Sequence, residues 1–312
     1  MDIAYIFSGQ GSQKLGMGYD LYQKSPKARK IFNEADEILG YKFSDTIFNA
    51  TEDVLMDTRN TQLALYIYQV VVALSQEDII PNAVAGHSLG EYSALTISKS
   101  ITFEDGLNLL KKRGEILHNA YKENPGSMGV VIGLEDKVVE EILADLRKEY
   151  NQGVFIANYN GPGQLVITGA RTLIKDACKR FLKLGAKRAL ALPMKASGHS
   201  PLAQKEGELL GKEIDKITFK EPIYPIYQCA DGKPHIDINE IKQNLKKHIT
   251  HPVQWTSITE NMVKDGHSKF YEIGADDTLQ KIVQRMYPEK FVTSIWTIPT
   301  YNNINPYKLE EL

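Results

Sequence analysis

The sequence predicts an α/β protein in which a mostly parallel sheet is covered by helices on both faces. Short apolar runs, typical of buried strands, alternate with segments of helical periodicity along most of the 312 residues. Residues 125–194 depart from this alternation and have the order β-α-β-β-α-β, which is typical of a ferredoxin-like unit. We therefore predict a large domain of residues 1–124 and 195–312, with a small ferredoxin-like domain of residues 125–194 inserted into it.

Apolar periodicity and the positions of Gly and Pro predict the elements of the first segment. A buried strand at 3–7 ends in the Gly-rich loop SGQGSQKLG, and a short strand at 83–85 is followed directly by a helix. Thr102 begins another helix, with Asp105 three residues later as an imperfect capping box. The helices predicted in this segment lie at 26–39, 61–74, 88–97 and 102–121.

The rest of the chain is assigned in the same way. In the small domain, strands are predicted at 128–133, 154–159, 164–168 and 188–193, and helices at 136–150 and 173–184. In the returning segment, strands are predicted at 223–228 and 269–273, and helices at 201–215, 238–248, 255–264 and 279–286. The last dozen residues are predicted to form a surface tail.

Composition excludes several classes of function. The 37 Lys and Arg residues nearly balance the 39 Asp and Glu residues, so no overall charge favours binding to nucleic acid or to a membrane surface. Two cysteines far apart in sequence do not indicate a disulfide framework and fit a reducing compartment. The N-terminus lacks the features of a secretory signal, and no run of about 18 apolar residues predicts a membrane span. We expect a cytoplasmic protein.

The segment Gly86-His87-Ser88-Leu89-Gly90 matches the G-x-S-x-G motif between a predicted strand and a predicted helix. A tight strand-to-helix turn is crowded, so the flanking positions must be glycine while the serine hydroxyl is exposed. The same turn places the N–H of Leu89 at a helix N-terminus, where it can face developing negative charge. This context favours Ser88 as a nucleophile. In the alternative interpretation Ser88 only caps the helix.

A nucleophilic serine needs a base, and histidine is the usual one because its pKa lies near neutrality. His199 lies on the seam between the two predicted domains, just before a helix, and is the natural choice. His87 adjoins the serine, but its side chain should leave the turn in another direction. The weaker candidates are predicted on a helix surface, in a loop or in a polar turn: His118, His235 and His267.

His248 and His251 are three residues apart, which raises the question of a metal site. No nearby cysteine or carboxylate completes a set of ligands in the sequence. We therefore predict no metal.

A series of ordered motifs spans residues 3–286 and gives the chain a recognisable pattern. It resembles the malonyl-CoA:acyl carrier protein transacylases and the free-standing acyltransferases of polyketide synthases that share their fold. That fold inserts a ferredoxin-like piece into an α/β-hydrolase-like core. The motifs are FSGQGSQ at 7–13, TQLALY at 61–66, GHSLGEYSAL at 86–95, KKRGE at 111–115, ANYNGPGQLVITG at 157–169, GAKRALALP at 185–193 and HPVQW at 251–255.

The resemblance implies a role for each matching position of the reaction centre. Ser88 matches the acylated serine, and His199 matches its general base in a dyad without an acidic third member. Gln10 and Leu89 match the two backbone N–H donors of the oxyanion hole. The main-chain carbonyl near His248 matches the group that holds the imidazole, a role that any side chain there would allow.

The resemblance also implies a pocket for a diacid. Gln62 matches a glutamine that lines it, and Arg113 matches the arginine that grips the free carboxylate of malonyl. A planar guanidinium replaces the lost hydration of a carboxylate with two parallel hydrogen bonds, and a neutral acyl chain would leave this cation buried and unpaired. In the alternative interpretation Arg113 lies on a solvated helix face, as Lys111 and Lys112 are expected to.

The implied reaction moves malonyl from malonyl-CoA to the phosphopantetheine thiol of an acyl carrier protein through a malonyl-serine ester. It needs no metal or redox cofactor, and members of the family are commonly monomers. An acidic carrier would meet Lys187 and Arg188, with further cations at Lys179, Arg180 and Lys183. Two alternatives stay open: a hydrolase of the same fold that clears stalled acyl groups from carrier proteins, and a docking module without catalysis.

Three positions depart from the family pattern. Ser8 stands where the family usually has proline, and we expect it to loosen the turn that aims Gln10. Gly198 stands where malonyl-selective members usually have phenylalanine, so we expect α-substituted malonyl groups to be tolerated better. The segment GADDTLQ at 274–280 replaces a GPGKVL-like turn, and its two aspartates are expected to change the charge near the entrance.

Overall fold

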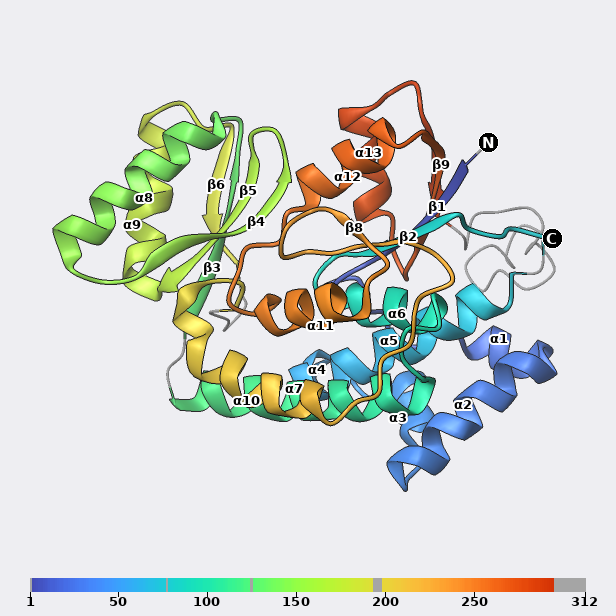
Figure 1. The fold of residues 1–312 in the computed structure, drawn as a ribbon. Helices are drawn as coiled ribbons and strands as arrows, with labels where there is room; N and C mark the ends of the chain where they lie inside the picture. The colour runs from blue at the N-terminus through green and yellow to red at the C-terminus, as the bar shows by residue number, and fades with distance from the viewer. Residues whose placement is uncertain (1, 77, 124–125, 193–197, 295–312) are drawn as a thin grey trace.

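The computed structural model describes residues 2–76, 78–123, 126–192 and 198–294. It confirms the α/β class: two sheets are packed with helices (Figure 1). One sheet has the strand order β10-β9-β1-β2-β7-β8, and the other has the order β4-β5-β3-β6. The strands are β1 (Asp2–Phe7), β2 (Ala83–Gly86), β3 (Gly126–Ile132), β4 (Val154–Gly161), β5 (Gln164–Ala170), β6 (Arg188–Ala191), β7 (Ile226–Tyr227), β8 (Pro234–His235), β9 (His267–Ile273) and β10 (Phe291–Ser294).

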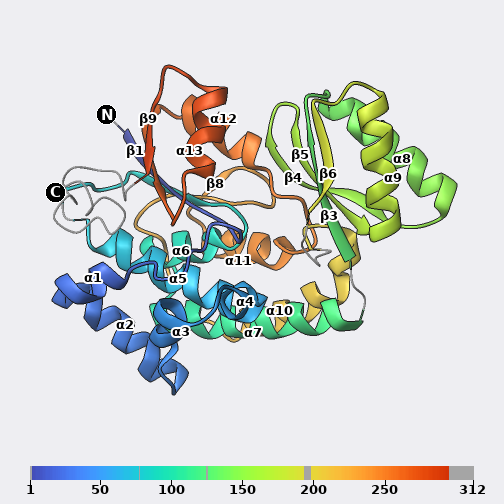
Figure 2. The same cartoon turned by 180° about the vertical axis from the view of Figure 1, so that it is seen from behind.

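The six-stranded sheet is parallel except at β8 and is covered on both faces, as expected for a parallel sheet. Along β1, Ala4 and Ile6 pack toward α12 and α13, whereas Tyr5 and Phe7 pack toward the core that contains α5 and α6. Figures 1 and 2 show these helix pairs on opposite sides of the sheet. The carboxyl ends of β1 and β2 therefore meet at one edge, where ligands of such sheets bind.

Helical periodicity predicts the long helices well, and three of them have the expected bounds: α2 (Pro26–Leu39), α8 (Asp136–Tyr150) and α12 (Trp255–Lys264). Thr102 caps its helix as predicted, because its hydroxyl accepts from the Asp105 N–H at 3.0 Å. The others differ by a few residues at their ends: α5 (Thr58–Leu74), α6 (Gly90–Ile97), α7 (Phe103–Glu123), α9 (Arg171–Lys183), α10 (Gln204–Asp215), α11 (Ile238–Lys247) and α13 (Thr278–Met286).

Several short elements differ from the prediction. The strand expected at 223–228 is reduced to Ile226–Tyr227, because Pro225 has no N–H and the N–H of Ile223 bonds to the Ser98 carbonyl instead. A 3₁₀ turn, Pro201–Ala203, precedes α10. Elements that the sequence did not predict are α1 (Tyr19–Lys24), α3 (Phe43–Asn49), α4 (Glu52–Met56), β8 and β10.

The four-stranded sheet is antiparallel and carries α8 and α9 on one face, in the order expected for a ferredoxin-like unit. We call β3–β6 with α8 and α9 the small unit. Strand β4 is joined to the rest of the chain by main-chain hydrogen bonds, from Tyr159 N to Val253 O and from Val253 N to Ala157 O. Both predicted domain boundaries fall at residues 124–125 and 193–197, outside the described residues, as does the predicted tail. Among the described helices, none is long and apolar enough to cross a membrane.

Candidate active site

The G-x-S-x-G segment forms a strained turn between β2 and α6. Ser88 has a φ of +50°, which side-chain-bearing residues rarely adopt. A Cβ at Gly86 would overlap the backbone of Gly90, and a Cβ at Gly90 would overlap the carbonyl of Phe7. Both glycines are therefore required by close packing, as the sequence predicts.

The structure brings Ser88 and His199 together across 111 residues. Ser88 Oγ lies 2.6 Å from His199 Nε2, and His199 Nδ1 lies 2.9 Å from the main-chain oxygen of His248. A carbonyl can only accept, so Nδ1 carries the proton and Nε2 is free to take the serine proton. His199 also has a positive φ, +59°, and its N–H bonds to the Ile249 carbonyl at 2.7 Å.

The imidazole of His199 is kept neutral by its surroundings. Burial, followed by repulsion from Arg113 and His87, lowers the pKa of His199 to about 3. An unprotonated base is the form that serine activation needs.

The loop after β1 brings Gln10 to the same cavity as Ser88. Within the described residues, the N–H groups of Gln10 and Leu89 have no hydrogen-bond partner. Leu89 itself does not line the cavity, because its side chain is buried in the core. Two unbonded donors beside a serine are what an oxyanion hole requires.

Ser8 does not loosen this loop, contrary to expectation. It is buried; its hydroxyl donates to Glu272 Oε1 at 2.9 Å, and its carbonyl accepts from Gln69 at 2.7 Å. Glu272 also accepts from the N–H groups of Leu279 and Gln280 at the start of α13. Burial raises the pKa of Glu272 to about 8. The serine thus ties the loop to α13. The sequence assigned no role to Glu272.

The turn at 274–280, which departs from the family pattern, has a local structural role. Asp276 accepts hydrogen bonds from the N–H and the hydroxyl of Thr278, and Asp276 also lines the cavity.

Arg113 is a buried cation that faces the cavity. Only 3% of it is exposed, and its guanidinium lies 5.6 Å from the centre of the Tyr92 ring. Its Nη1 donates to Gln62 at 2.6 Å, its Nε has no partner, and no carboxylate lies within ion-pair distance among the described residues. Gln62 is fully buried behind Arg113 rather than in the cavity wall, which corrects its predicted place.

These groups surround a cavity of about 300 Å³. Its polar lining includes Gln10, Ser88, Arg113 and His199. Apolar side chains, which the sequence did not assign, come from both units: Met128 and Val166 from β3 and β5, Leu192 directly after β6, and Leu117, Tyr121, Ile249, Leu279 and Ile282 from outside the small unit. Asn158 and Asn160 of β4 also line it. The ANYNG motif is the sequence signal that could have identified these asparagines.

Gly198 lines the cavity as predicted, but the space beside it is not empty. A Cβ at this position would lie 3.0 Å from Ile249 Cδ1. Ile249 therefore fills part of the space that a larger residue at 198 would occupy.

His87 leaves the turn away from the dyad, as predicted. Its Nε2 lies 2.8 Å from Asn160 Oδ1, and its ring packs edge-on against Trp255 at 5.5 Å. Burial lowers the pKa of His87. It connects the turn to the small unit.

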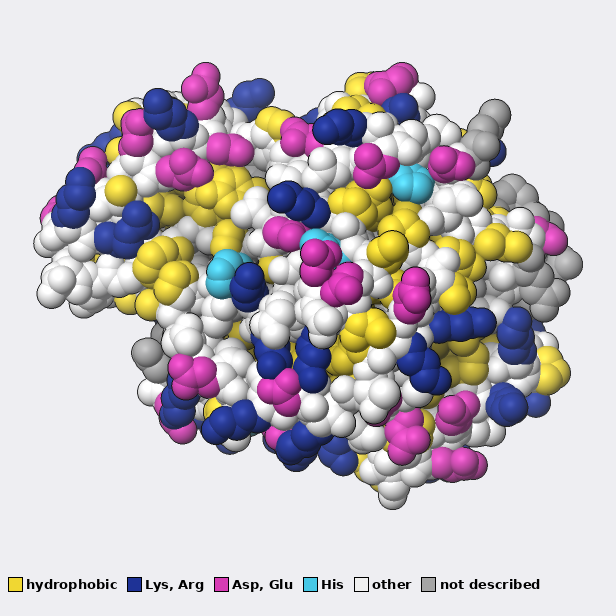
Figure 3. Space-filling model, viewed as in Figure 1, with side chains coloured by type: hydrophobic (Ala, Val, Ile, Leu, Met, Phe, Trp, Pro, Cys, Tyr) yellow, Lys and Arg dark blue, Asp and Glu magenta, His cyan; other side chains and the backbone are white. Residues whose placement is uncertain are grey.

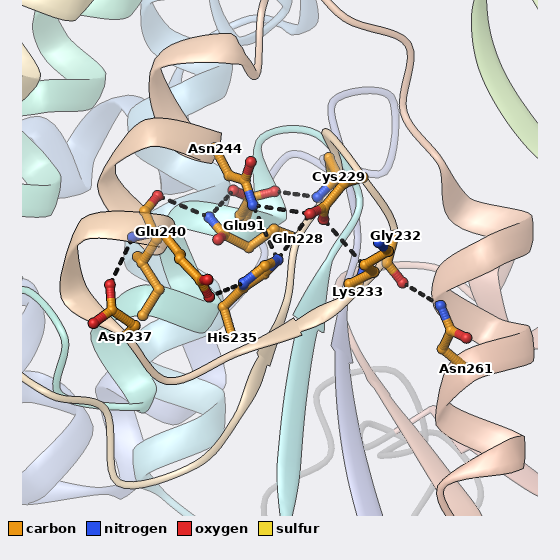
Figure 4. Close-up of polar contacts among 12 residues, drawn as sticks. Glu91, Gln228, Cys229, Gly232, Lys233, His235, Asp237, Glu240, Asn244 and Asn261 are labelled. Carbon is orange, nitrogen blue, oxygen red and sulfur yellow. Dashed lines mark hydrogen bonds and ion pairs between the residues drawn. The ribbon is translucent and has the colours of Figure 1, made fainter.

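A buried polar cluster lies behind the turn, and it corrects the sequence-based statement that no cysteine or carboxylate lies near His248. The ligand-type atoms of Glu91, Cys229 and His248 lie within 4.8 Å of one another. Each has a protein partner: Glu91 accepts from the Cys229 N–H at 2.7 Å, the Cys229 thiol donates to Gly86 O, and His248 Nε2 lies 3.1 Å from Ser88 O. Figure 4 shows the Glu91–Cys229 contact. Hydrogen bonds therefore join Glu91 to Cys229, and join Cys229 and His248 to the turn that holds Ser88.

The remaining histidines take no part in the cavity. His118 is half-buried rather than on the helix surface, and His267 is buried at the start of β9 rather than in a polar turn. His235 lies in β8 between Asp231 and Glu240, 2.9 Å from each, and these carboxylates raise its pKa. Figure 4 shows its contact with Glu240. The second member of the predicted pair, His251, is exposed and bonds to its own turn.

The predicted carrier surface lies on the small unit. Lys187 and Arg188 are exposed, and neither has an ion pair among the described residues. Arg180, by contrast, is paired with Glu149 and Asp176. Figure 3 shows basic and acidic side chains interspersed over this face of the molecule. Lys187 and Arg188 are therefore more available than Arg180 for contact with a partner.

Known proteins resemble the chain over most of its length. The family model described as "Acyl transferase domain" matches residues 4–306. The chain is 33% identical over 295 residues to malonyl CoA-acyl carrier protein transacylase of Staphylococcus aureus (strain MRSA252), covering 95% of this chain and 96% of that one. It is 33% identical over 286 residues to the protein of that name in Bacillus subtilis (strain 168), covering 91% and 90%.

Solved structures are similar over nearly the whole length. A type II polyketide synthase malonyl-transacylase, solved in complex with its acyl-carrier protein, superposes with a TM-score of 0.90 at 31% identity, covering 94% of this chain and 96% of that one. Malonyl CoA-acyl carrier protein transacylase from Clostridium perfringens superposes with a TM-score of 0.91 at 30% identity, covering 100% and 98%.

Proposed function

The chain belongs to the acyl transferase domain family, and we propose that Ser88 and His199 carry its transfer reaction. The protein is an acyltransferase that moves malonyl from malonyl-CoA to an acyl carrier protein. The observation that carries the substrate assignment is Arg113: a buried guanidinium with an unbonded Nε in the same cavity as the serine. A carboxylate at the far end of the acyl group would complete its hydrogen bonds.

The first half-reaction acylates the enzyme. His199 Nε2 takes the hydroxyl proton as Ser88 Oγ attacks the thioester carbon, and the N–H groups of Leu89 and Gln10 hold the resulting oxyanion. The C–S bond then breaks, His199 returns the proton to the sulfur, and CoA departs as the free thiol, so that a malonyl-serine ester remains. In the second half, His199 deprotonates the carrier thiol and the sulfur attacks the ester carbon. The C–O bond to Ser88 then breaks, His199 returns the proton to Ser88 Oγ, and malonyl leaves as a thioester of the carrier.

Intact-mass measurement after mixing with a panel of acyl-CoAs tests this assignment. Wild type should gain one malonyl group. Ser88→Ala should gain none, and Arg113→Ala should lose its preference for malonyl over acetyl. A modified Ser88→Ala protein would refute the assignment of the nucleophile.

A second assay separates transfer from hydrolysis. Radiolabelled malonyl-CoA should label a holo-carrier protein, whereas release of free acid from an acetyl-carrier protein would indicate the hydrolase. The buried cation favours transfer, because clearing neutral acyl groups does not need Arg113.

We further propose a tolerance for α-substituted malonyl groups at Gly198, docking of the carrier on Lys187 and Arg188, and action as a cytoplasmic monomer without metal or redox cofactor. The chemistry above supports the absence of a cofactor, since side chains supply every proton transfer. Unchanged turnover after chelation, and a single monomer-sized species in gel filtration, are the expected results.

A further inference from the structure

His248 contacts both members of the dyad through different atoms. Its main-chain oxygen accepts from His199 Nδ1 at 2.9 Å, and its side-chain Nε2 lies 3.1 Å from the main-chain oxygen of Ser88. The first contact needs no particular side chain. The second depends on the imidazole, and the two residues are 160 positions apart.

The direction of this second hydrogen bond is fixed by its partner. A carbonyl oxygen cannot donate, so Nε2 of His248 must carry the hydrogen. The other nitrogen, Nδ1, is buried without a partner among the described residues, and a proton there would be an unbonded buried donor. Burial, with repulsion from His199 and Arg113, also holds the pKa of His248 well below its ordinary value. The ring is a neutral donor aimed at Ser88 O.

The Ser88 carbonyl and the Leu89 N–H belong to one peptide group. Because that group is planar and trans, its C=O and N–H point in opposite directions, and fixing the oxygen fixes the direction of the N–H. A hydrogen bond accepted by the oxygen also polarises the group and strengthens the N–H as a donor. We propose that the His248 side chain is a positioning residue, which holds the Ser88–Leu89 peptide so that the Leu89 N–H faces the oxyanion.

The surroundings leave the ring little freedom to move. His248 is fully buried, and its ring packs edge-on against Tyr92 at 5.7 Å and against His199 at 5.1 Å. Glu91 Oε2 lies 3.9 Å from Nε2, beyond hydrogen-bond distance. Glu91 is occupied by the Cys229 N–H and by Gln228 Nε2 (Figure 4), so it does not compete for the imidazole hydrogen.

The support is needed because the turn is strained. Ser88 has a positive φ, and apart from His248 its carbonyl accepts only from the Glu91 N–H at 3.0 Å within the described residues. The inference rests on the proposed function only in taking Ser88 as the nucleophile. It is independent of which acyl group Ser88 accepts.

Two substitutions of nearly matched size separate positioning from packing. His248→Phe keeps a flat ring but removes the N–H donor, whereas His248→Gln keeps a donor. His267→Phe is the control, since His267 is another buried imidazole, packed on Tyr227 and remote from the cavity. Rapid-mixing acylation is measured with malonyl-CoA and with p-nitrophenyl acetate, after thermal melting confirms that each variant is folded.

Loss of a whole oxyanion donor slows catalysis about 10²–10³-fold, and a misdirected donor should cost less. We expect His248→Phe to slow Ser88 acylation by either reagent about tenfold, with little change in KM. His248→Gln should stay within about threefold of wild type, and His267→Phe should equal it. The acid limb of the pH profile should not move, because the main-chain contact to His199 remains.

The inference is overturned if folded His248→Phe acylates at the wild-type rate, or if His248→Gln is as slow as His248→Phe. Should His248→Phe fail to fold, His248→Leu takes its place with the same expected rates. Failure of wild type to react with malonyl-CoA, while it still reacts with the ester, would count against the proposed function alone.

Discussion

The six-stranded sheet and the small unit line the same cavity but contribute different kinds of group. The carboxyl ends of β1 and β2 present Gln10 and Ser88 on tightly bonded turns, with His199 and Arg113 buried beside them. The small unit contributes the apolar Met128 and Val166, the two asparagines of β4 and, on its outer surface, Lys187 and Arg188, which have no ion pair within the described ranges.

The two regions therefore differ in how exactly their groups must be placed. Proton transfer, charge stabilisation and pairing with a buried carboxylate need atoms held to within a fraction of an ångström, which the hydrogen-bonded groups outside the small unit provide. Recognising a carrier needs surface charge, which tolerates small shifts. Changes to the buried charged groups should therefore have the largest effects, whereas changes on the outer surface of the small unit should have the smallest.

The largest effect is expected at Arg113. Arg113→Ala should lower kcat/KM for malonyl-CoA about 10²–10³-fold, because the incoming carboxylate would be buried without its partner. The value for acetyl-CoA should change little or rise. Arg113→Lys should recover only part of the loss, since an ammonium lacks the paired donors. Equal losses for both substrates would show that Arg113 does not select the acyl group.

The pH dependence of acylation should differ from that of an ordinary histidine. With the pKa of His199 lowered to about 3, the base stays unprotonated as pH falls through 6.5. The single-turnover rate should therefore be nearly the same at pH 5 and pH 7, whereas the rate with an unperturbed imidazole would fall about 25-fold between pH 7 and pH 5. A fall centred near pH 6.5 would contradict the buried, neutral dyad.

The three buried histidines should also change stability over the same range. Below about pH 6.5 an unfolded imidazole takes up a proton that the folded, buried His199, His87 and His248 do not. Since the unfolded state then binds more protons at these positions, the histidines lower the free energy of unfolding as pH falls. Glu272, whose folded pKa is raised to about 8, acts in the opposite direction and offsets part of this loss. Urea titrations at pH 5 and pH 7 would measure this, and would confirm that the protein used for kinetics is folded.

A medium effect is expected at Gly198, which lines the cavity beside Ile249. Gly198→Phe should lower the ratio of kcat/KM for methylmalonyl-CoA to that for malonyl-CoA about tenfold, because the ring fills space beside the α-carbon. Ile249→Val, which widens the same place, should shift the ratio the other way. An unchanged ratio in both variants would remove Gly198 from the determinants of selectivity.

A smaller effect is expected at the tie between the Gln10 loop and α13. Ser8→Ala removes the hydroxyl that donates to Glu272 and should lower the free energy of unfolding by about 1 kcal/mol. Acylation should slow by no more than about fivefold, because Gln69 still holds the Ser8 carbonyl. Urea unfolding and single-turnover kinetics measure the two quantities. A stability equal to wild type would show that the tie contributes nothing.

The smallest effect is expected on the outer surface of the small unit. Exposed charges contribute little individually, so Lys187→Ala and Arg188→Ala should each raise KM for the carrier protein about two- to threefold and leave the acylation rate unchanged. The effect should diminish with added salt. Arg180→Ala is the matched control, because that arginine is already paired within the small unit. Equal effects of all three substitutions would contradict the proposed docking site.

Local patterns predicted much of the fold, because long amphipathic helices and the small unit have strong periodicity. The bounds of α2, α8 and α12 are those expected. Helices of five to seven residues, such as α3 and α4, are too short to show a repeated apolar face. Strand β7 is shorter than expected because of Pro225. The apolar pattern of the surrounding residues had predicted a strand through this position.

The sequence predicted the site residues that belong to a local motif. It did not predict the contacts between segments that are far apart in the sequence. The motif around Ser88 shows its chemistry in five residues. The placement of Gln62 behind Arg113, and the hydrogen bond from His248 to Ser88, depend on how distant segments pack. The role of Glu272 could not be predicted from the sequence for the same reason, since its partners Ser8 and Leu279 lie on separate elements.

Both members of the dyad occupy backbone conformations that favour glycine, and this has a consequence for heat resistance. Holding a side-chain-bearing residue at φ near +50° costs about 1 kcal/mol or more, which glycine would not incur. Ser88→Gly should therefore melt at a temperature equal to or above that of wild type, although it has lost its nucleophile. The active enzyme would then be no more heat-resistant than the inactive variant, because holding the Ser88 hydroxyl in its reactive position lowers the stability of the fold.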